Sequence, residues 1–249
     1  MLPKLTFSID VEPDLHTGKY RGVTEGLARL KVLCDKYDVK PILFVTSDCL
    51  SKNALIFKKF SQKGWEISFH GKSHKRFDEM SESQKEEEIS SSVKLFKNKL
   101  GFYPKGFRAP QHGIDDSTLD LLVKYGFKYD SSYTPLNLLQ LLFFPRKFSL
   151  WARNFFSRRR IYHIRRGLLE IPTTSFFVPF VSLTLRVLPK VFLKSYIRLI
   201  KLTYERPLFY AHSWDFIEMK DSKVDRIFPH TLFLNKLEYI MKNESSRAN

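Results

Sequence analysis

The chain has 249 residues, 43% of them hydrophobic, so it can bury one substantial core. Its 42 basic and 26 acidic residues give a formal charge of +16, which indicates an anionic partner: nucleic acid, a phosphorylated substrate or an acidic membrane surface. No run reaches the roughly 18 uninterrupted apolar residues of a spanning helix. Cys34 and Cys49 lie in apolar stretches without metal-binding spacing, so we expect buried thiols and no disulfide.

Short apolar, β-rich runs alternate with longer segments of helical period, which is the pattern of repeated βα units around a parallel sheet. The predicted strands are 4–10, 40–46, 65–69, 105–109, 127–130, 168–172 and 207–212, and the predicted helices are 22–37, 51–63, 82–100, 115–125, 189–204 and 230–243. This order predicts a seven-stranded barrel related to the eight-stranded βα type, whose reactive groups gather at the carboxyl ends of the strands. We expect one domain over residues 1–249.

Polar residues follow five of the predicted strands at their carboxyl ends, and they are Asp10 and Glu12, His70 and His74, Arg108, Asp130, and His212. The segment HGKSH is the most specific of these signals. Its two imidazoles, four residues apart at a strand-to-helix junction, can bind one ion, and a carboxylate completes a set that leaves positions open for water. Taken singly, an acidic pair is more often a solvated loop and a lone histidine an ordinary hydrogen-bonded residue.

Five segments occur in a fixed order along the chain: FSIDVE, FHGKSH, GFRAPQHG, FKYDSS and LFYAHSWDF. In that order they resemble the polysaccharide deacetylases, also called the NodB-homology or carbohydrate esterase 4 group, whose fold is a distorted seven-stranded (β/α) barrel. The resemblance implies a metal-dependent hydrolase that removes an N-acyl group, acetyl or formyl, from an amino sugar of a glycan or a lipid-linked saccharide.

The resemblance also implies the roles of individual residues. His70 and His74 correspond to metal ligands, and the acidic motif supplies a third ligand and a general base. In the family two aspartates are adjacent, whereas Val11 separates Asp10 from Glu12 here. We assign Asp10 as the base and Glu12 as the ligand, with the reverse left open. The implied cofactor is one divalent metal, zinc, with cobalt, nickel or manganese as alternatives.

Further roles follow from the same motifs. Arg108 corresponds to the arginine that pairs with the base, His212 to the general acid, and Asp130 to the residue that tunes this acid. The backbone N–H of Gln111 would stabilise an oxyanion. The other candidate substrate contacts are His112, Trp214, Asp215 and Asp14, the last of which could instead be a turn residue. We expect Glu170 to form a structural ion pair.

Residues 141–206 hold fourteen Arg and Lys against two acidic residues, and so carry most of the net charge. They belong to a predicted basic and aromatic insertion at about 133–206. One basic stripe is predicted along a helix, formed by Arg186, Lys190, Lys194, Arg198 and Lys201. Insertion and stripe together predict peripheral contact with an anionic membrane. The alternative is a helix that packs on the barrel and exposes a solvated basic face.

The chain runs from Met1 straight into a strand, which leaves no room for a signal peptide, so we expect a cytoplasmic protein at the inner face of the cell membrane. Two rival functions remain open. One is a related barrel hydrolase that acts on another C–N bond. The other is a basic protein that binds nucleic acid or glycan without catalysis, but nucleic-acid binding leaves the five motifs unexplained, so we expect no such partner.

Overall fold

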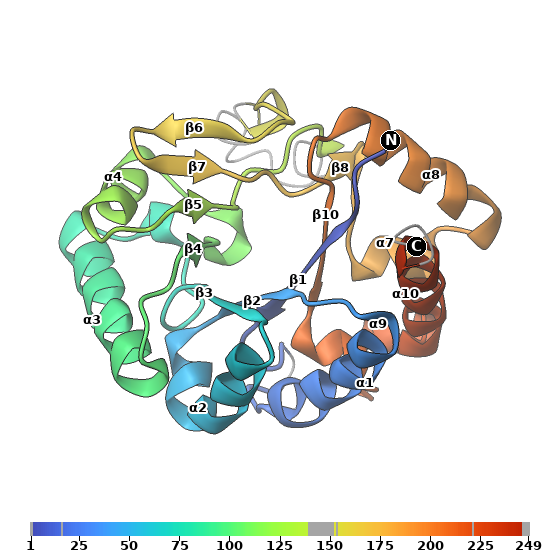
Figure 1. Cartoon of the computed structure of the whole chain (residues 1–249), viewed down its shortest axis with the longest axis horizontal. Helices are drawn as coiled ribbons and strands as arrows, with labels where there is room; N and C mark the ends of the chain where they lie inside the picture. The colour runs from blue at the N-terminus through green and yellow to red at the C-terminus, as the bar shows by residue number, and fades with distance from the viewer. Residues whose placement is uncertain (1, 16, 139–151, 153, 221, 246–249) are drawn as a thin grey trace.

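The computed structural model describes residues 2–15, 17–138, 152, 154–220 and 222–245. Within these residues one sheet has the strand order β10-β1-β2-β3-β4-β5-β7-β6 (Figure 1). Its strands are β1 (Thr6–Val11), β2 (Ile42–Val45), β3 (Glu66–Phe69), β4 (Gly106–Phe107), β5 (Tyr129–Asp130), β6 (Tyr162–Arg165), β7 (Leu168–Glu170) and β10 (Leu208–His212). All neighbours are parallel except β6, which runs antiparallel to β7. The fold is a distorted α/β half-barrel.

All seven predicted strands are present, several of them shorter than predicted. The added strand, β6, lies within the predicted insertion at 133–206 and forms an edge of the main sheet. A separate two-stranded sheet, β8 (Ser175–Phe176) and β9 (Val178–Pro179), follows β7. The aromatic part of the insertion falls largely on residues 139–151 and 153, outside the described residues. The assignment of one domain stays a prediction.

The gap in the barrel beside β10 is closed by an irregular segment, not by a paired strand. The backbone N–H of Tyr210 donates to the carbonyl of Phe180 at 3.3 Å, and that of Leu208 donates to Thr174 Oγ1 at 2.7 Å. The chain after β7 therefore lies along β10.

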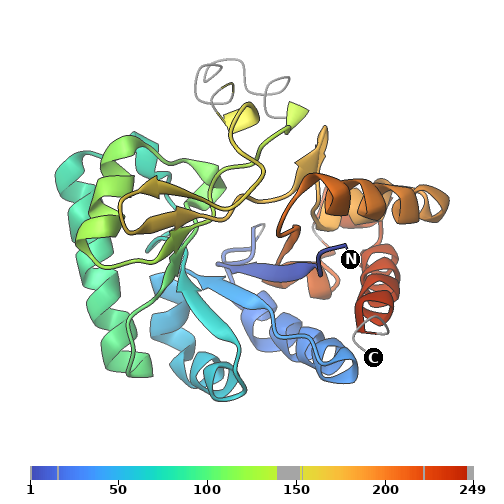
Figure 2. The same cartoon turned by 45° about the horizontal axis from the view of Figure 1, so that its top comes forward.

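Helices cover the outside of the sheet (Figures 1 and 2). They are α1 (Leu27–Tyr37), which follows a π-helical turn at Gly22–Gly26, α2 (Ser47–Gln62), α3 (Glu82–Leu100), α4 (Asp116–Lys124), α7 (Ser182–Val187), α8 (Lys190–Thr203), α9 (Lys223–Ile227) and α10 (His230–Ser245). Ser81 and Gln84 form a capping box at the start of α3, and Gly101 ends it with φ 87°. Among the described helices, none has the length and apolar character to cross a membrane.

The two faces of the sheet bury different side chains. On β1, Phe7, Ile9 and Val11 join the large core between sheet and helices. The intervening side chains face the barrel interior, because successive residues of a strand point to opposite faces. A smaller apolar cluster that includes Phe44 fills that interior, and the guanidinium of Arg108 lies over the Phe44 ring at 4.1 Å. The polar groups at the strand ends thus lie next to an apolar cluster inside the barrel.

The predicted basic stripe does not form. Arg186 belongs to α7, is buried, and contacts the carboxylates of Asp215 and Asp225. Lys201 is also buried and pairs with Glu244 at 2.6 Å. Both cations neutralise acidic residues that lie far from them in sequence. The stripe members that remain exposed are Lys190, Lys194 and Arg198.

Candidate active site and metal centre

The end of β1 directs two carboxylates into the barrel. Asp10 and Glu12 are two residues apart, so the alternation of the strand places them on the same face, with Val11 in the opposite core. They have different partners. Asp10 Oδ1 accepts a hydrogen bond from Arg108 at 2.6 Å, and Glu12 Oε2 contacts His74 Nε2. One carboxylate is therefore held by a cation and the other by imidazole.

Glu12, His70 and His74 form a group whose potential ligand atoms all lie within 4.8 Å of one another. His70 follows β3, and its Nδ1 donates to the backbone carbonyl of Arg108 at 2.8 Å. That hydrogen bond leaves the lone pair of Nε2 facing Glu12 Oε2, 3.9 Å away. His74 reaches the same point from a backbone in the left-handed region, with φ 61°.

These three residues fit a divalent cation. Glu12 Oε2 is buried and contacts His74 Nε2, yet it accepts no hydrogen bond of normal geometry from the described residues, whereas a buried carboxylate oxygen normally has a donor. Burial lowers the pKa of His70, which favours the neutral imidazole that binds metals. Two imidazoles and one carboxylate are a common ligand set of zinc sites that keep a position open for water.

Arg108 holds Asp10 ionised. Its guanidinium is fully buried and also donates to Ser8 Oγ and to the Ser131 carbonyl, both at 3.1 Å. Burial alone would raise the pKa of Asp10, but the charge of Arg108, followed by those of His70 and His212, lowers that pKa to about 2. The free oxygen, Oδ2, lies 3.9 Å from His70 Nε2. Asp10 thus presents an ionised oxygen beside the group of possible ligands.

His212, at the end of β10, completes the cluster. Its Nε2 lies 3.8 Å from Glu12 Oε1, and its Nδ1 lies 3.6 Å from Asp215 Oδ2. The ring stacks on Trp214 with centroids 4.5 Å apart and 7° between the planes. Burial opposes the charged form, but the hydrogen bond with Asp215 and the charge of Glu12 raise the pKa of His212 to about 9.

The expected pairing of Asp130 with His212 is not present, and Asp215 occupies that place. Asp130 instead accepts from Ser132 Oγ at 2.6 Å and shares a hydrogen bond with Glu170. The predicted ion pair of Glu170 is also wrong. Burial, and then the charge of Asp130, raise the pKa of Glu170 well above its ordinary value. These two buried carboxyl groups share a proton.

Two of the candidate substrate contacts, Asp14 and His112, form hydrogen bonds within the protein instead. Asp14 accepts hydrogen bonds from the backbone N–H groups of Arg21 at 2.9 Å and Gly22 at 2.8 Å, so it is the turn residue of the alternative prediction. His112 Nδ1 donates to the Ser132 carbonyl at 2.9 Å. Burial, and then the charge of Arg108, lower the pKa of His112 to about 4, so this side chain is neutral.

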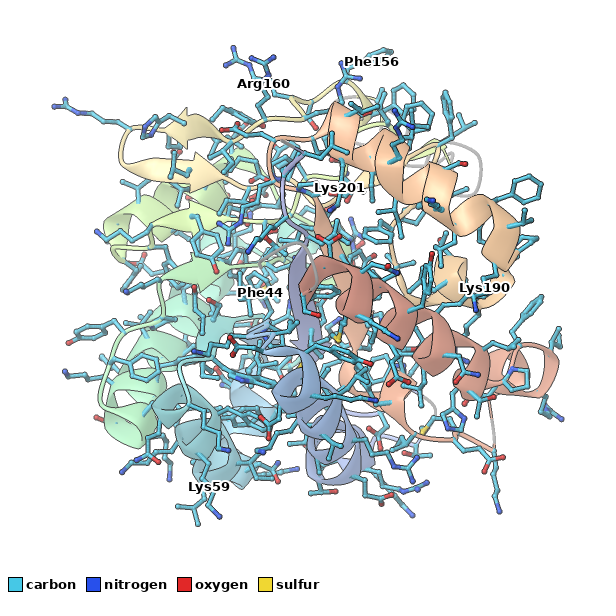
Figure 3. All side chains as sticks on the ribbon, turned by 45° about the vertical axis from the view of Figure 1, so that its right-hand side comes forward. Phe44, Lys59, Phe156, Arg160, Lys190 and Lys201 are labelled. Atoms are coloured by element: carbon cyan, nitrogen blue, oxygen red, sulfur yellow. The ribbon has the colours of Figure 1, made fainter. Side chains whose placement is uncertain are left out.

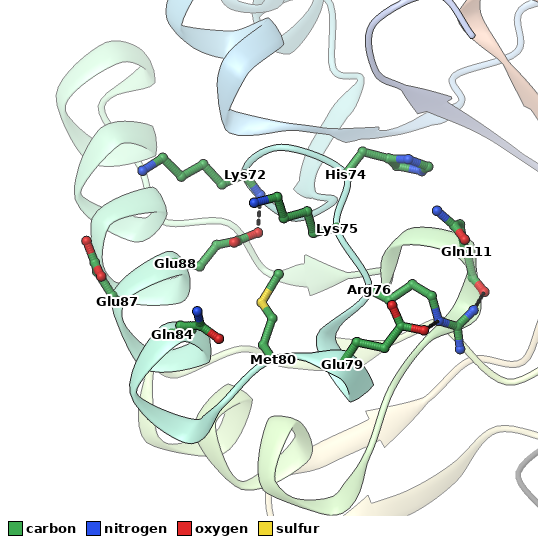
Figure 4. Close-up of a pocket in the computed structure, with 10 residues that line it drawn as sticks. All are labelled: Lys72, His74, Lys75, Arg76, Glu79, Met80, Gln84, Glu87, Glu88 and Gln111. Carbon is green, nitrogen blue, oxygen red and sulfur yellow. Dashed lines mark hydrogen bonds and ion pairs between the residues drawn. The ribbon is translucent and has the colours of Figure 1, made fainter.

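An open groove of about 700 Å³ extends from the site toward α3. Figure 4 shows His74 and Gln111 at one end of this groove and Glu87 at the other. The Gln111 side chain is exposed, and the backbone carbonyl of this residue accepts a hydrogen bond from Arg76 at 3.1 Å. The groove gives an extended molecule direct access to His74.

Residues 18–129 match the sequence model of the family described as polysaccharide deacetylase, a range that includes His70, His74 and Arg108. A peptidoglycan deacetylase of Helicobacter pylori is 32% identical over 123 residues, which make up 49% of this chain and 42% of that protein. The chain thus spans less than half the length of this relative.

Solved structures share the fold at low sequence identity. A family 4 carbohydrate esterase from Streptomyces lividans, in complex with acetate, aligns with a TM-score of 0.52 and 11% identity over 95% of this chain and 90% of its own. An allantoinase aligns with a TM-score of 0.63 and 15% identity over 94% and 83%. Sequence match, fold and ordered motifs agree, and residues 18–129 of the chain are similar to the polysaccharide deacetylase family.

Proposed function

We propose that the protein is a metal-dependent hydrolase that removes an acetyl or formyl group from the nitrogen of an amino sugar. One observation carries the proposal: the donor atoms of Glu12, His70 and His74 converge beside Asp10 and His212. A metal-ligand set, an ionised carboxylate and an imidazole are the groups that amide hydrolysis requires.

Each residue has a distinct part in the proposed reaction. An ion held by Glu12, His70 and His74 would acidify a bound water and polarise the acyl carbonyl. Asp10 Oδ2 accepts the proton of the attacking water, while Arg108 holds the other oxygen. The His212 imidazolium donates a proton to the departing nitrogen. The C–N bond then breaks, which leaves a free amine on the sugar and a carboxylic acid.

The groove supports an extended amino sugar as the substrate. Lys72 and Lys75 are exposed along the groove that begins at His74, and Glu79, Glu87 and Glu88 also line it. Its open, polar shape suits a glycan or a lipid-linked saccharide. We assign zinc as the metal, because the set of one carboxylate and two imidazoles is one that zinc commonly occupies. The charge of +16 supports action at the inner, anionic face of the cell membrane.

The test is acyl release by the purified chain. We expect acetate or formate from N-acylated glucosamine oligomers when zinc or cobalt is added, and none after chelation. Asp10→Asn should lower kcat about 10²–10⁴-fold and still bind metal, whereas Glu12→Gln should lose the metal. Glu82→Gln, exposed at the start of α3 and outside the groove, is the matched control and should behave as wild type.

Two outcomes would reject this function. Full activity after chelation would remove the metal from the mechanism. Hydrolysis confined to small cyclic or linear amides, with oligosaccharides untouched, would assign the site to another C–N bond.

A further inference from the structure

Helix α8 exposes an apolar face opposite the face that it buries. Leu193 and Ile200 are buried against the rest of the protein. On the other side Val191 is 76% exposed, Leu202 65% and Phe192 59%. A helix on the surface of a water-soluble domain normally carries polar side chains there, so a run of large apolar groups indicates a contact surface.

The basic residues of α8 lie on or beside this apolar face. At about 100° per residue, Val191 and Leu202 fall on nearly the same line of the helix. Phe192 lies on one side of that line, and Lys194 and Arg198 lie on the other. Both cations are exposed, and no ion pair is recorded for either among the described residues. Arg198, about 20° from Val191, therefore shares the crest of the helix with the apolar groups, and Lys194, about 60° away, lies along one border.

The surface continues onto the segment before β6. Phe156, Arg158, Arg159 and Arg160 share a groove of about 700 Å³ with Leu202 of α8. Phe156 is 81% exposed, and all three arginines are exposed. Figure 3 shows Phe156 and Arg160 projecting outward from the same edge of the molecule, with Lys59 on the opposite side. Two segments far apart in sequence thus form one surface.

We propose that this surface, the crest of α8 with Phe156 and Arg158–Arg160, docks on an anionic lipid bilayer. The apolar side chains would enter the boundary of the acyl chains, and the Lys and Arg side chains would contact lipid phosphates. In the described part of residues 152–206, the acidic residues are Glu170, which is buried, and Glu205. Few acidic side chains of this segment would therefore be repelled by the anionic headgroups of the bilayer.

A nucleic-acid partner fits this surface less well. Single strands bind to rings on which bases stack, within a basic groove. Val191 and Leu202, at the crest of α8, cannot stack with a base, and they would be left against water beside a polyanion. In a bilayer the aliphatic side chains can contact acyl chains while the charged side chains contact phosphates. The inference uses the proposed function only to suggest why a membrane is nearby, and docking requires no catalysis.

The test is flotation of the full chain with lipid vesicles, without substrate. Wild type should float with phosphatidylcholine vesicles that contain phosphatidylglycerol and remain unbound with phosphatidylcholine alone. The triple variant Arg158→Gln, Arg159→Gln, Arg160→Gln should bind about a hundredfold more weakly. The variant Val191→Ser, Phe192→Ser, Leu202→Ser should lose binding as well.

Matched controls keep the result specific. Val32→Ser with Leu55→Ser removes equally exposed apolar groups elsewhere, and Lys58→Gln with Lys59→Gln removes charge from the other side. Both controls should float like wild type. All variants change exposed side chains, so an unchanged thermal midpoint and unchanged acyl release from a short water-soluble oligomer would show that fold and site are intact.

Three results would overturn the inference. The first is that wild type floats with neither vesicle, and the second is that the α8 variant floats as well as wild type. The third is that the arginine variant loses binding to a single-stranded oligonucleotide while wild type does not bind vesicles, which would assign the surface to nucleic acid. Because vesicle and oligonucleotide binding do not use the reaction, failure here leaves the proposed hydrolase intact, and loss of activity leaves docking intact.

Discussion

Arg186 donates a hydrogen bond to Asp215 at 3.0 Å, and Asp215 in turn accepts one from the backbone N–H of His212 at 2.9 Å. Arg186 also contacts Asp225, and the side chains of all three charged residues are buried. A cation of α7 therefore fixes the carboxylate beside the proposed general acid, just as Arg108 fixes Asp10 on the other side of the site.

Replacing Arg186 by methionine should destabilise the protein strongly. The change leaves two buried carboxylates without their cation, and breaking a buried pair in this way costs about 3–5 kcal/mol. Urea unfolding of Arg186→Met should therefore show a midpoint far below that of wild type. Arg198→Met is the control, because Arg198 is exposed on α8 and its loss should change the unfolding free energy by about 0.5 kcal/mol or less. Equal midpoints for the two variants would mean that the buried cluster contributes nothing.

Trp214 offers a second test of how His212 is held. The two rings stack with 7° between their planes, so the indole fixes the plane of the imidazole. We expect Trp214→Ala to lower kcat about tenfold to a hundredfold with a small change in KM, because a misplaced proton donor slows the chemical step. Trp214→Phe keeps a flat ring and should recover most of the rate. A large rise in KM at constant kcat would instead show that Trp214 binds the sugar, as the sequence predicted.

Much of the fold could be predicted because it depends on local patterns. Apolar β-rich runs predicted all seven parallel strands, and the motifs at their ends pointed to residues that the structure does bring together. The spacing of Asp10 and Glu12 also predicts that both carboxylates lie on one side of the sheet, because alternate residues of a strand share a face. Likewise, the three-residue spacing of His212 and Asp215 permits the side-chain contact, Nδ1 to Oδ2 at 3.6 Å, that replaces the one expected from Asp130.

The errors concern partners that are distant in sequence. Arg186 and Lys201 fitted a helical stripe, and nothing nearby revealed that Asp215, Asp225 and Glu244 would neutralise them. Strand β6, with the sequence YHIR, lies within the predicted insertion and was not predicted as a strand. In the structure, Arg165 of that strand pairs with Asp116 and Asp120 of α4, contacts that span more than forty residues. The hydrophobic period of a helix identifies its apolar and polar faces, but it does not identify the residues that pack against them.

The Asp130 and Glu170 pair should make stability depend on pH in the direction opposite to that of a salt-bridged acid. The pKa of Glu170 is raised in the folded state, so folding holds a proton that the unfolded chain releases above its ordinary pKa of 4.5. The contribution of Glu170 to the free energy of unfolding is therefore fully present below its ordinary pKa. Above that pKa it falls by about 1.4 kcal/mol per pH unit until the pH reaches the pKa of the folded state.

Glu170→Gln isolates this effect. The amide can donate to Asp130 and still accept from the backbone N–H of Tyr133, as Glu170 Oε1 does at 3.1 Å. We expect the variant to be the more stable protein at alkaline pH and to show a flatter dependence of the unfolding free energy on pH. Urea titrations over a pH series would measure this dependence. Glu87→Gln, an exposed change on α3, should keep the wild-type slope, and an unchanged slope in Glu170→Gln would exclude the shared proton.

Metal binding should stabilise the folded chain through His74 and its partners. An ion that binds only the folded state adds about 2.7 kcal/mol at a free concentration one hundred times its Kd. Thermal unfolding of the chelated protein should thus show a midpoint that rises when zinc is added and falls back when chelator is added.

His74→Ala should abolish the rise, because it removes one of the three ligand atoms. His163→Ala, an exposed histidine of β6, should respond to zinc as wild type does. If His74→Ala and His163→Ala respond alike, the stabilising ion binds elsewhere, and Glu12, His70 and His74 are only a cluster of polar side chains.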